Sequence, residues 1–207
     1  GLIGGSLGLA IKKRRIAKFV VGVVRRKRSA IEAVRRKAVD MATLELKEGV
    51  RGADLVILCS PVSTIISQLK ALGSFIRKDT LVIDVGSSKS QICHLAKRYF
   101  NVGARSPRPG RGNPAPTFVG CHPMAGSEKC GIEFADGNLF EGSICFMTQK
   151  NGKIEVFWKR LGSRPLRIDP DRHDTWAAKS SHLPHALSFS LFQNVNSLNH
   201  AIKKECS

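Results

Sequence analysis

The sequence predicts an α/β fold, in which a doubly wound parallel sheet is followed by the start of an all-helical region. Two features of the sequence lead to this prediction. Short apolar runs rich in β-branched residues alternate with helical patterns in the first part of the chain, and the pattern is helical from residue 171 onward. We therefore expect one domain over residues 1–169 and the start of a second, helical domain over residues 170–207.

The expected strands are the apolar runs, which have the pattern of buried strands in a parallel sheet. They lie at residues 19–24, 54–59, 80–85, 118–121, 143–148 and, at the sheet edge, 165–168. The helices are expected at residues 30–37, 64–72, 90–99, 154–161 and from 171 onward. Ser29 is the expected N-cap of the first of these helices. Pro184 should kink or restart the last one, because proline has no backbone N–H to donate.

A segment rich in proline and glycine interrupts this alternation at residues 103–117. It contains four prolines and three arginines but no apolar run. Such a composition is typical of loops and disordered insertions rather than of core elements. We therefore expect a loop or disordered insert here, with the sheet resuming at Phe118.

The charge of the chain is strongly positive and unevenly distributed. The formal net charge is +18, and the window from Lys12 to Lys37 holds twelve basic residues and a single acid, Glu32. Such a window is typical of nucleic-acid binding, of binding to a phosphate-bearing cofactor or anionic substrate, or of solvated helix faces. Nucleic-acid binding by stacking needs aromatic side chains among the cations, and this window offers only Phe19. Nucleic acid is therefore the least favoured of these partners.

The composition also argues against several classes of protein. No apolar run approaches the roughly 18 residues that a membrane-spanning helix needs, and no secretory signal is visible. The six cysteines include no C-x-x-C pair, so we expect neither a metal site nor a dense disulfide framework. Reduced thiols in a cytoplasmic protein are the simplest account, although a plastid location stays open.

The chain opens on a glycine-rich turn that leads into a helical pattern. Gly1 and Gly4 have the spacing of the second and third glycines in the dinucleotide-binding fingerprint G-x-G-x-x-G, although a plain glycine-rich turn is the alternative. Because a helix N-terminus attracts a pyrophosphate, Gly1, Leu2, Ile3 and Gly4 are expected to bind a dinucleotide on a Rossmann-like sheet. On this interpretation the first strand would precede residue 1. A sheet without its central strand would expose two edges and be poorly stable.

Two further segments follow strands and are expected to contact this cofactor. An NAD site needs an acid at the end of the second strand, where the sequence has Val24, Arg25 and Arg26. Arginine binds phosphate well, so the sequence favours NADP over NAD unless these side chains only face solvent. The next strand is followed by three more expected cofactor residues, Ser60, Pro61 and Val62. The alternative for Ser60 is an N-cap.

The most informative stretch is the one in which the strand at residues 118–121 runs directly into His122 and Pro123. Open α/β sheets place their chemistry at the carboxyl ends of their strands. An imidazole that is neutral near pH 7 can act there as a general base. Taken alone, however, a histidine in a tight turn is the more common explanation of such a residue.

Three motifs in the same order resemble those of the prephenate and arogenate dehydrogenase family. Residues 118–131 read F-V-G-C-H-P-M-A-G-S-E-K-C-G, against G-x-H-P-[MI]-A-G-[ST]-E-x-x-G in the family. Residues 84–89 match its D-x-G-S-x-K segment, and residues 181–185 match its S-H-L-P-H segment. Residues 136–142 and the dipeptide His173-Asp174 also fit. The resemblance therefore covers nearly the whole chain.

The resemblance implies an NADP- or NAD-dependent enzyme of tyrosine biosynthesis that oxidatively decarboxylates prephenate or arogenate. In it, His122 would be the catalytic base, and Ser87 would contact both the substrate hydroxyl and His122. Four further residues would line or gate the substrate site: Ser127, Glu128, His182 and His185. Helix capping or packing is the alternative for the last two histidines. The family also implies a homodimer.

Other interpretations remain at this point. The family binds a substrate carboxylate through an arginine of its helical domain, and this chain ends before that segment. We therefore expect a fragment without the first strand and most of the helical domain, which alone can be inactive. A catalytically incomplete remnant that still holds a nucleotide is one alternative, and a basic nucleic-acid-binding protein is another. Hydroxyacid dehydrogenases of the same fold usually rely on a catalytic lysine, which the His-Pro segment does not resemble.

Overall fold

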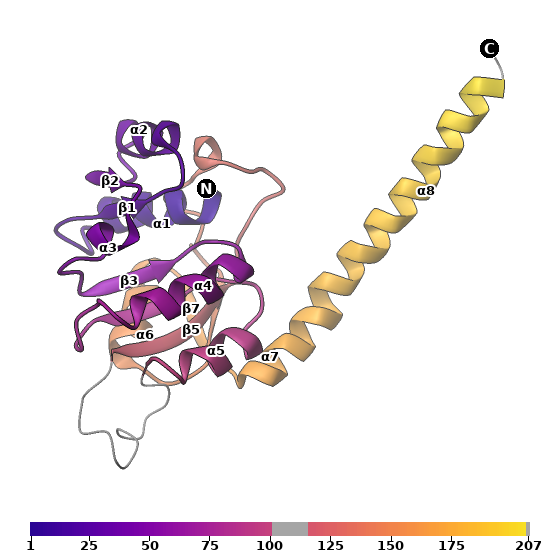
Figure 1. Ribbon diagram of the computed structural model, residues 1–207. Coiled ribbons are helices and arrows are strands. Elements are labelled where there is room, and N and C mark those ends of the chain that lie inside the picture. The colour runs from indigo at the N-terminus through magenta and orange to yellow at the C-terminus, as the bar shows by residue number, and fades with distance from the viewer. Residues whose placement is uncertain (101–115, 206–207) are drawn as a thin grey trace.

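The computed structural model describes residues 1–100 and 116–205, with side chains described through residue 197. The main sheet has helices on both faces, and a long C-terminal helix extends away from this body (Figure 1). This arrangement confirms the predicted α/β class with a helical region after the sheet. The insert predicted at residues 103–117 lies almost wholly outside the described residues.

The described strands form two sheets. The larger sheet has the spatial order β3 (Leu55–Leu58), β4 (Leu81–Asp84), β5 (Thr117–Pro123), β6 (Ile144–Met147), β7 (Arg164–Arg167). The smaller sheet consists of β1 (Val21–Val23) and β2 (Met41–Thr43). Every pair is parallel except that of β5 with β6, and β7 lies at the edge as predicted.

The antiparallel pairing of β6 with β5 corrects the prediction of a wholly parallel sheet. The reason lies in the connection between the two strands. A parallel neighbour requires a crossover, usually through an α-helix. Residues 124–143 contain only η1 (Ile132–Phe134), which is a short 3-10 helix. The chain therefore turns back beside β5, and His122 pairs with Phe146 across the ladder.

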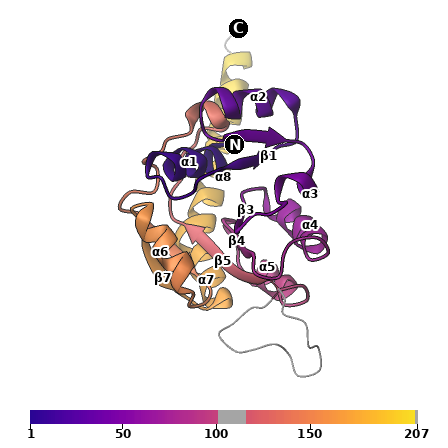
Figure 2. The ribbon, with the colours of Figure 1, turned by 90° about the vertical axis from the view of Figure 1, so that its left-hand side faces the viewer.

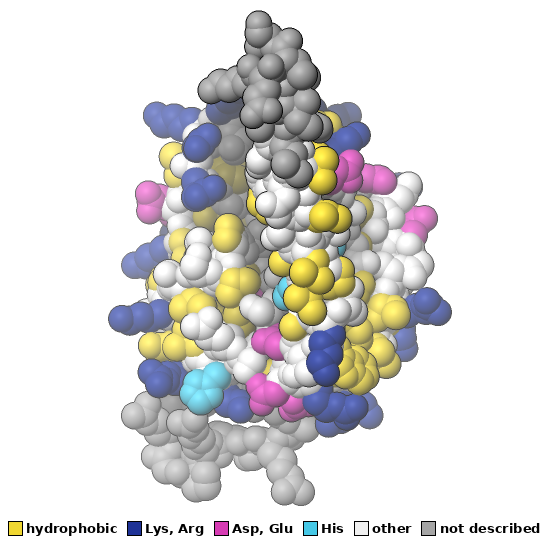
Figure 3. Space-filling model, turned by 90° about the vertical axis from the view of Figure 1, so that its right-hand side faces the viewer, with side chains coloured by type: hydrophobic (Ala, Val, Ile, Leu, Met, Phe, Trp, Pro, Cys, Tyr) yellow, Lys and Arg dark blue, Asp and Glu magenta, His cyan; other side chains and the backbone are white. Residues whose placement is uncertain are grey.

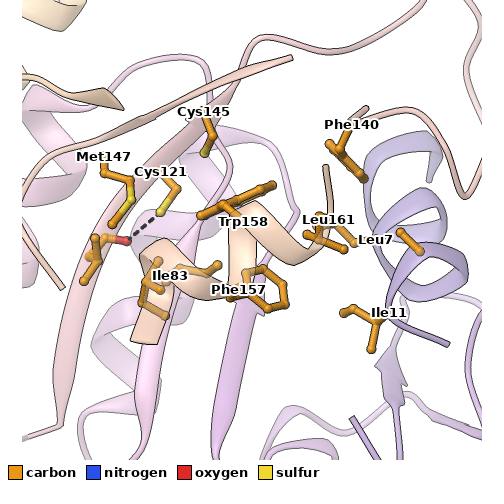
Figure 4. Close-up of a cluster of buried hydrophobic side chains, with 13 residues drawn as sticks. Leu7, Ile11, Ile83, Cys121, Phe140, Cys145, Met147, Phe157, Trp158 and Leu161 are labelled. Atoms are coloured by element: carbon orange, nitrogen blue, oxygen red, sulfur yellow. Dashed lines mark hydrogen bonds between the residues drawn. The ribbon is translucent and has the colours of Figure 1, made fainter. Parts of the chain in front are cut away.

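The two sheets are not hydrogen-bonded to each other. Among the described residues, β1 and β3 therefore each keep one edge without a ladder partner, as the sequence predicts. Helix α1 (Leu2–Lys13) connects the two sheets by packing. Its Leu7 side chain is buried in the same cluster as Ile83 of β4 (Figure 4), and Gly8 lies against the backbone of Ala38, just before β2. Figure 2 shows the small sheet and α1 together above the larger sheet.

Most of the remaining helices of the α/β body lie close to where the sequence places them. They are α2 (Lys27–Arg35), α3 (Leu46–Gly49), α4 (Val62–Leu72), α5 (Ser90–Ala96) and α6 (Gly152–Arg160). Ser29 is not an N-cap, because β1 passes almost directly into α2 and the extended backbone ends at Arg26, which is the N-cap. Ser29 therefore lies inside the first turn. Neither β2 nor α3 is predicted from the sequence.

Two buried clusters cover the faces of the larger sheet. One lies under α1 and α6, where Trp158 packs edge-on against Phe140 with 5.8 Å between ring centroids (Figure 4). The other lies under α4 and α5 and includes Phe100 and Phe118. The five cysteines within the described residues carry free thiols. Because β4 and β5 are covered on both faces, the positions of their carboxyl ends are fixed by packing.

Two helices follow the sheet, and a π-helical turn joins them. Helix α7 (Pro170–Ala177) passes into this turn at Ala178–His182, after which α8 (Leu183–Glu205) begins. Pro184 is the second residue of α8, so the predicted restart of the helix is confirmed. The wider turn relieves the clash of a proline ring with the carbonyl of the preceding turn. Helix α8 extends from the body and carries exposed apolar side chains (Figure 3). None of the described helices combines the length and apolar character that crossing a membrane requires.

Replacing Gly8 by alanine should destabilise the fold, because a Cβ at this position would lie 2.1 Å from the carbonyl oxygen of Ala38. Displacing α1 should lower the free energy of unfolding by about 1–3 kcal/mol, which urea denaturation measures. Gly152→Ala is the matched control, since a Cβ there has no neighbour within 4 Å. Equal stability of the two variants would show that α1 is not held against this carbonyl.

Candidate active site

The carboxyl ends of β4 and β5 bring the two predicted catalytic residues to the same edge of the sheet. The strands are parallel neighbours with Asp84 opposite Gly120, so the turn after β4 lies beside the end of β5. Ser87 on that turn and His122 on β5 line one cavity of about 250 Å³. The first turn of α1 and the loop after β5 contribute to the same cavity through Leu2, Ile3, Pro123, Ala125, Gly126 and Ser127. Five residues predicted from the sequence therefore meet here.

The glycine turn forms the start of α1 beside this cavity. Gly1 is the N-cap, and no side chain accepts a hydrogen bond from the N–H groups of the first turn. A Cβ on Gly4 would lie 3.3 Å from the Cβ of Cys59, at the end of β3. The turn is therefore packed closely against the end of β3.

The other predicted cofactor residues lie at the ends of β1 and β3. Pro61 is the N-cap of α4 and Val62 its first residue, so Ser60 precedes the cap, and no side chain caps this helix. Arg25 and Arg26 follow β1, and both are exposed. These five residues lie at strand ends as predicted, but none of them lines the cavity at His122.

The His122 ring is set up to be neutral at physiological pH. Burial lowers the pKa of His122 to about 4, and the nearby ammonium of Lys89 lowers it as well. The cause is that a partly dehydrated imidazolium loses hydration that the neutral ring does not need. A neutral ring keeps one nitrogen lone pair, which can accept a proton.

A second histidine holds the ring of His122. The Nδ1 atom of His122 lies 2.9 Å from the Nε2 atom of His173, whose residue is only 1% exposed. On its other side, Nδ1 of His173 lies 2.8 Å from Oδ1 of Asp174. Because Nδ1 of His122 is engaged in this contact, its Nε2 is the ring nitrogen left for the cavity.

The Asp174 carboxylate also anchors the helix that follows the Ser87 turn. It accepts hydrogen bonds from the backbone N–H of Lys89 at 2.6 Å and of Ser90 at 2.9 Å, at the start of α5. Burial alone would raise the pKa of Asp174, but the bonds from His173, Ser90 and Lys89 outweigh burial and lower it. Asp174 is therefore an ionised carboxylate near neutral pH, and it links α7 to the edge of the sheet.

An ion pair beneath the Ser87 turn is fully buried. The ammonium of Lys89 pairs with the carboxylate of Asp84, both side chains are 0% exposed, and the backbone N–H of Gly86 donates to the same carboxylate at 2.9 Å. Burial raises the pKa of Asp84, and the ammonium of Lys89 counteracts that rise. Removing either partner would leave an uncompensated buried charge, so the two residues stay together. Because Gly86 also bonds to Asp84, this pair holds in place the turn that carries Ser87.

Three predicted substrate residues lie outside the cavity wall. Glu128 is exposed and accepts a hydrogen bond from the Ser127 hydroxyl at 3.1 Å. His185 is exposed on α8, where its Nδ1 is 2.8 Å from the carbonyl oxygen of Ser181. His182 is exposed at the end of the π-helical turn. The positions of His182 and His185 fit the alternative of helix capping or packing as well as they fit the predicted role in lining or gating the substrate site.

Sequence reasoning missed the contribution of His173 and Asp174 to the site. The sequence shows the dipeptide only as a match to the family pattern. A signal for its contribution exists, since His173 and Ala177 are four residues apart on the buried face of α7. A histidine on a buried helix face beside an aspartate needs partners, and His122 is one such partner.

The site belongs to a chain with clear relatives. The family model described as the nucleotide-binding domain of prephenate dehydrogenase matches residues 7–159, which is well over half of the chain. The chain belongs to the prephenate dehydrogenase family. A prephenate dehydrogenase of Lactococcus lactis subsp. cremoris is 36% identical over 192 residues, which make up 92% of this chain and 51% of the relative. The chain thus spans about half the length of this relative.

Solved structures of prephenate dehydrogenase family members share the fold. The structure of prephenate dehydrogenase from Aquifex aeolicus in complex with hydroxyphenyl propionate and NAD+ superimposes with a TM-score of 0.80 at 28% identity, covering 96% of this chain and 66% of that one. Arogenate dehydrogenase from Synechocystis superimposes with a TM-score of 0.74 at 29% identity, covering 93% and 66%. The described fold is therefore that of the family.

Acidification should destabilise the folded chain through His122. Its pKa is about 4 when folded, against 6.5 for a free histidine, so between these values the unfolded chain binds the extra proton. The contribution of His122 to the free energy of unfolding should therefore fall as the pH drops from about 6.5 and level off below about 4. Chemical denaturation across this range measures it, and His122→Gln should flatten the slope, whereas the surface control His94→Gln should not.

An NMR titration of the His122 ring tests the same point directly. A midpoint near 6.5 for this ring would contradict the prediction, because it would show that burial does not disfavour the imidazolium.

Proposed function

We propose that this chain acts in a dehydrogenase that oxidatively decarboxylates prephenate or arogenate with NADP+ or NAD+ as hydride acceptor, in tyrosine biosynthesis. The observation that carries the proposal is the cavity shared by His122, Ser87 and the first turn of α1. It places a neutral base, a hydroxyl group and a helix N-terminus around one small space. Membership of the prephenate dehydrogenase family supports this assignment of the chemistry.

The first turn of α1 fits the pyrophosphate of a dinucleotide. Its N–H groups have no side-chain acceptor, and the helix dipole adds partial positive charge. Gly1, Leu2, Ile3 and Gly4 would therefore bind the pyrophosphate, and Ser60, Pro61 and Val62 would contact the cofactor from the end of β3. When bound, the nicotinamide supplies the hydride acceptor.

NADP is the favoured cofactor within this proposal. The carboxyl end of β1 offers Val24 where an NAD site needs an acid, and the exposed guanidinium groups of Arg25 and Arg26 follow. Arginine can grip a 2′-phosphate through two parallel hydrogen bonds. The NAD+ in the Aquifex aeolicus complex shows which dinucleotide that relative accepts, and it leaves the preference of this chain as a proposal.

The chemical role of His122 follows from its position and protonation state. Its Nε2 lone pair would accept the proton of the substrate ring hydroxyl while the hydride leaves the same carbon. The bond to the ring carboxylate then breaks, its electron pair completes the aromatic ring, and carbon dioxide departs. The Ser87 hydroxyl would hold the substrate hydroxyl against His122. Aromatisation favours the products strongly. The main tasks of the protein are therefore to orient the reacting groups and to accept the hydroxyl proton.

The substrate side of the site is assigned by the same proposal. Ser127 lies on the cavity wall, and Glu128, His182 and His185 would meet the substrate from the adjacent loop and helices. We assign residues 1–169 to the cofactor domain and residues 170–207 to the helical substrate domain. The exposed apolar side chains of α8 support a homodimer built through that helix (Figure 3).

Replacing Arg25 and Arg26 together by alanine should weaken NADP binding at least tenfold and leave NAD binding nearly unchanged. The reason is that only NADP carries the 2′-phosphate that these side chains would grip. Calorimetric titration of each cofactor measures the two dissociation constants. Lys150→Ala with Lys153→Ala is the control for a general loss of positive charge. Equal loss of affinity for both cofactors would contradict the assignment of the 2′-phosphate site.

His122→Asn should lower kcat for prephenate or arogenate oxidation by about 10²–10⁴-fold without changing cofactor affinity, because it removes only the proton acceptor. Stopped assays of NAD(P)H formation and of carbon dioxide release measure the effect. Cofactor binding without turnover of either substrate in the parent protein would count against the proposed reaction and in favour of a nucleotide-binding remnant.

A further inference from the structure

The contacts between the two histidines and Asp174 allow their protons to be placed. Asp174 is ionised, so it only accepts, and Nδ1 of His173 must carry the proton in that contact. With His173 neutral, its Nε2 holds a lone pair, and Nδ1 of His122 carries the proton between the rings. The remaining nitrogen of His122, Nε2, is then left with the lone pair. A doubly protonated His173 would instead donate from Nε2 and place the proton of His122 on its own Nε2.

We propose that His173 and Asp174 are positioning residues that fix the tautomer of His122, so that the Nε2 lone pair points into the cavity. The significance for catalysis rests on the proposed function, whereas the tautomer itself does not. Neither residue lies within residues 7–159, which match the nucleotide-binding domain of the family. The tautomer of His122 on β5 is therefore set by α7, a helix that follows the sheet.

Packing holds the rings in the orientation that these hydrogen bonds require. The His122 and His173 rings meet edge to face, with centroids 5.0 Å apart and planes at 72°. On its other side, His173 packs edge to face on Phe146, with centroids 5.5 Å apart. Phe146 is also the residue opposite His122 in the β5–β6 ladder. A 180° flip of either ring would keep these ring planes but would break the hydrogen bonds.

The arrangement also accommodates the charge that arises during the reaction. When Nε2 of His122 accepts a proton, its Nδ1–H still donates to His173, and no other proton has to move. The carboxylate of Asp174 lies at the far end of the row and attracts the new positive charge. The same carboxylate caps α5 directly after the Ser87 turn, so one group positions both the base and the hydroxyl.

The first test is the tautomer of His122 in the unaltered protein. Long-range ¹⁵N–¹H correlation spectra of ¹⁵N-histidine-labelled protein near pH 7 distinguish a protonated Nδ1 from a protonated Nε2. The His122→Gln spectrum assigns the signals. We expect a protonated Nδ1 and an unprotonated Nε2 for His122. A protonated Nε2 would overturn the proposal without any variant of His173.

Two substitutions of His173 separate orientation from mere packing. His173→Gln places an amide oxygen near the former Nε2, where it can still accept the Nδ1–H of His122. His173→Asn places its amide near the former Nδ1, where it can reach Asp174 but leaves His122 without an acceptor. We expect the tautomer to persist in the Gln variant and to shift toward protonated Nε2 in the Asn variant. The same tautomer in both folded variants would overturn the proposal.

Steady-state kinetics tests the consequence for catalysis. The Asn variant should lose about 10²-fold or more in kcat, the Gln variant should retain clearly more activity, and cofactor KM should stay unchanged in both. Equal losses in the two variants would overturn the positioning role. The expected tautomers together with no turnover by the parent protein would instead reject the proposed function and leave the assignment of the protons standing.

Discussion

The carboxylate of Asp174 is the group through which the helical region is joined to the edge of the sheet that carries the candidate site. It accepts hydrogen bonds from two backbone N–H groups at the start of α5 and from the ring of His173. The first two bonds fix α7 against the segment that follows Ser87. The third reaches His122 through His173. The placement of α7 against the ends of β4 and β5 therefore depends on one ionised side chain, and the pKa of that side chain is lowered by these bonds.

A second constraint is the way in which α1 holds the two sheets together. Among the described residues, no strand-to-strand hydrogen bonds connect β1 with β3, and α1 packs against both sheets. Leu7 packs toward the larger sheet. On the side of the smaller sheet, Gly8 approaches Ala38 and Lys12 pairs with Asp40, both just before β2. The same helix lends Leu2 and Ile3 to the cavity wall. The geometry of the site thus depends on α1 as well as on the carboxyl ends of β4 and β5.

Local patterns in the sequence predict the parts of the fold whose signals are local. The β-branched runs at β3 and β4 and the strand that ends at His122 are found where the sequence places them. Strand β2 and helix α3 are missed because three residues of Met41–Thr43 and four of Leu46–Gly49 show no clear period. The antiparallel direction of β6 depends on the absence of a crossover helix before it, which apolar periodicity does not reveal.

The candidate site also has one part that local sequence motifs predict and another part that only the folded chain brings together. His122 and Ser87 are predicted because each follows a strand within a short motif. The contact between His122 and His173 joins residues 51 positions apart, and it exists only because α7 returns to the edge of the sheet. No spacing rule connects the two residues. The resemblance to the family marked His173-Asp174 as a match, but only the folded arrangement gives the dipeptide a physical role.

The positive charge of the chain gains a more specific meaning from the structure. Within the basic window, Lys12 pairs with Asp40, and Arg35 and Arg36 both pair with Glu32. The first pair joins α1 to the segment before β2, whereas the pairs of Glu32 lie along α2. All three cations are engaged and therefore less able to bind a polyanion. Arg25 and Arg26 are instead exposed at the end of β1, the side of the sheet on which open α/β folds bind ligands. Their exposure at this edge is what the proposed contact with a cofactor 2′-phosphate requires.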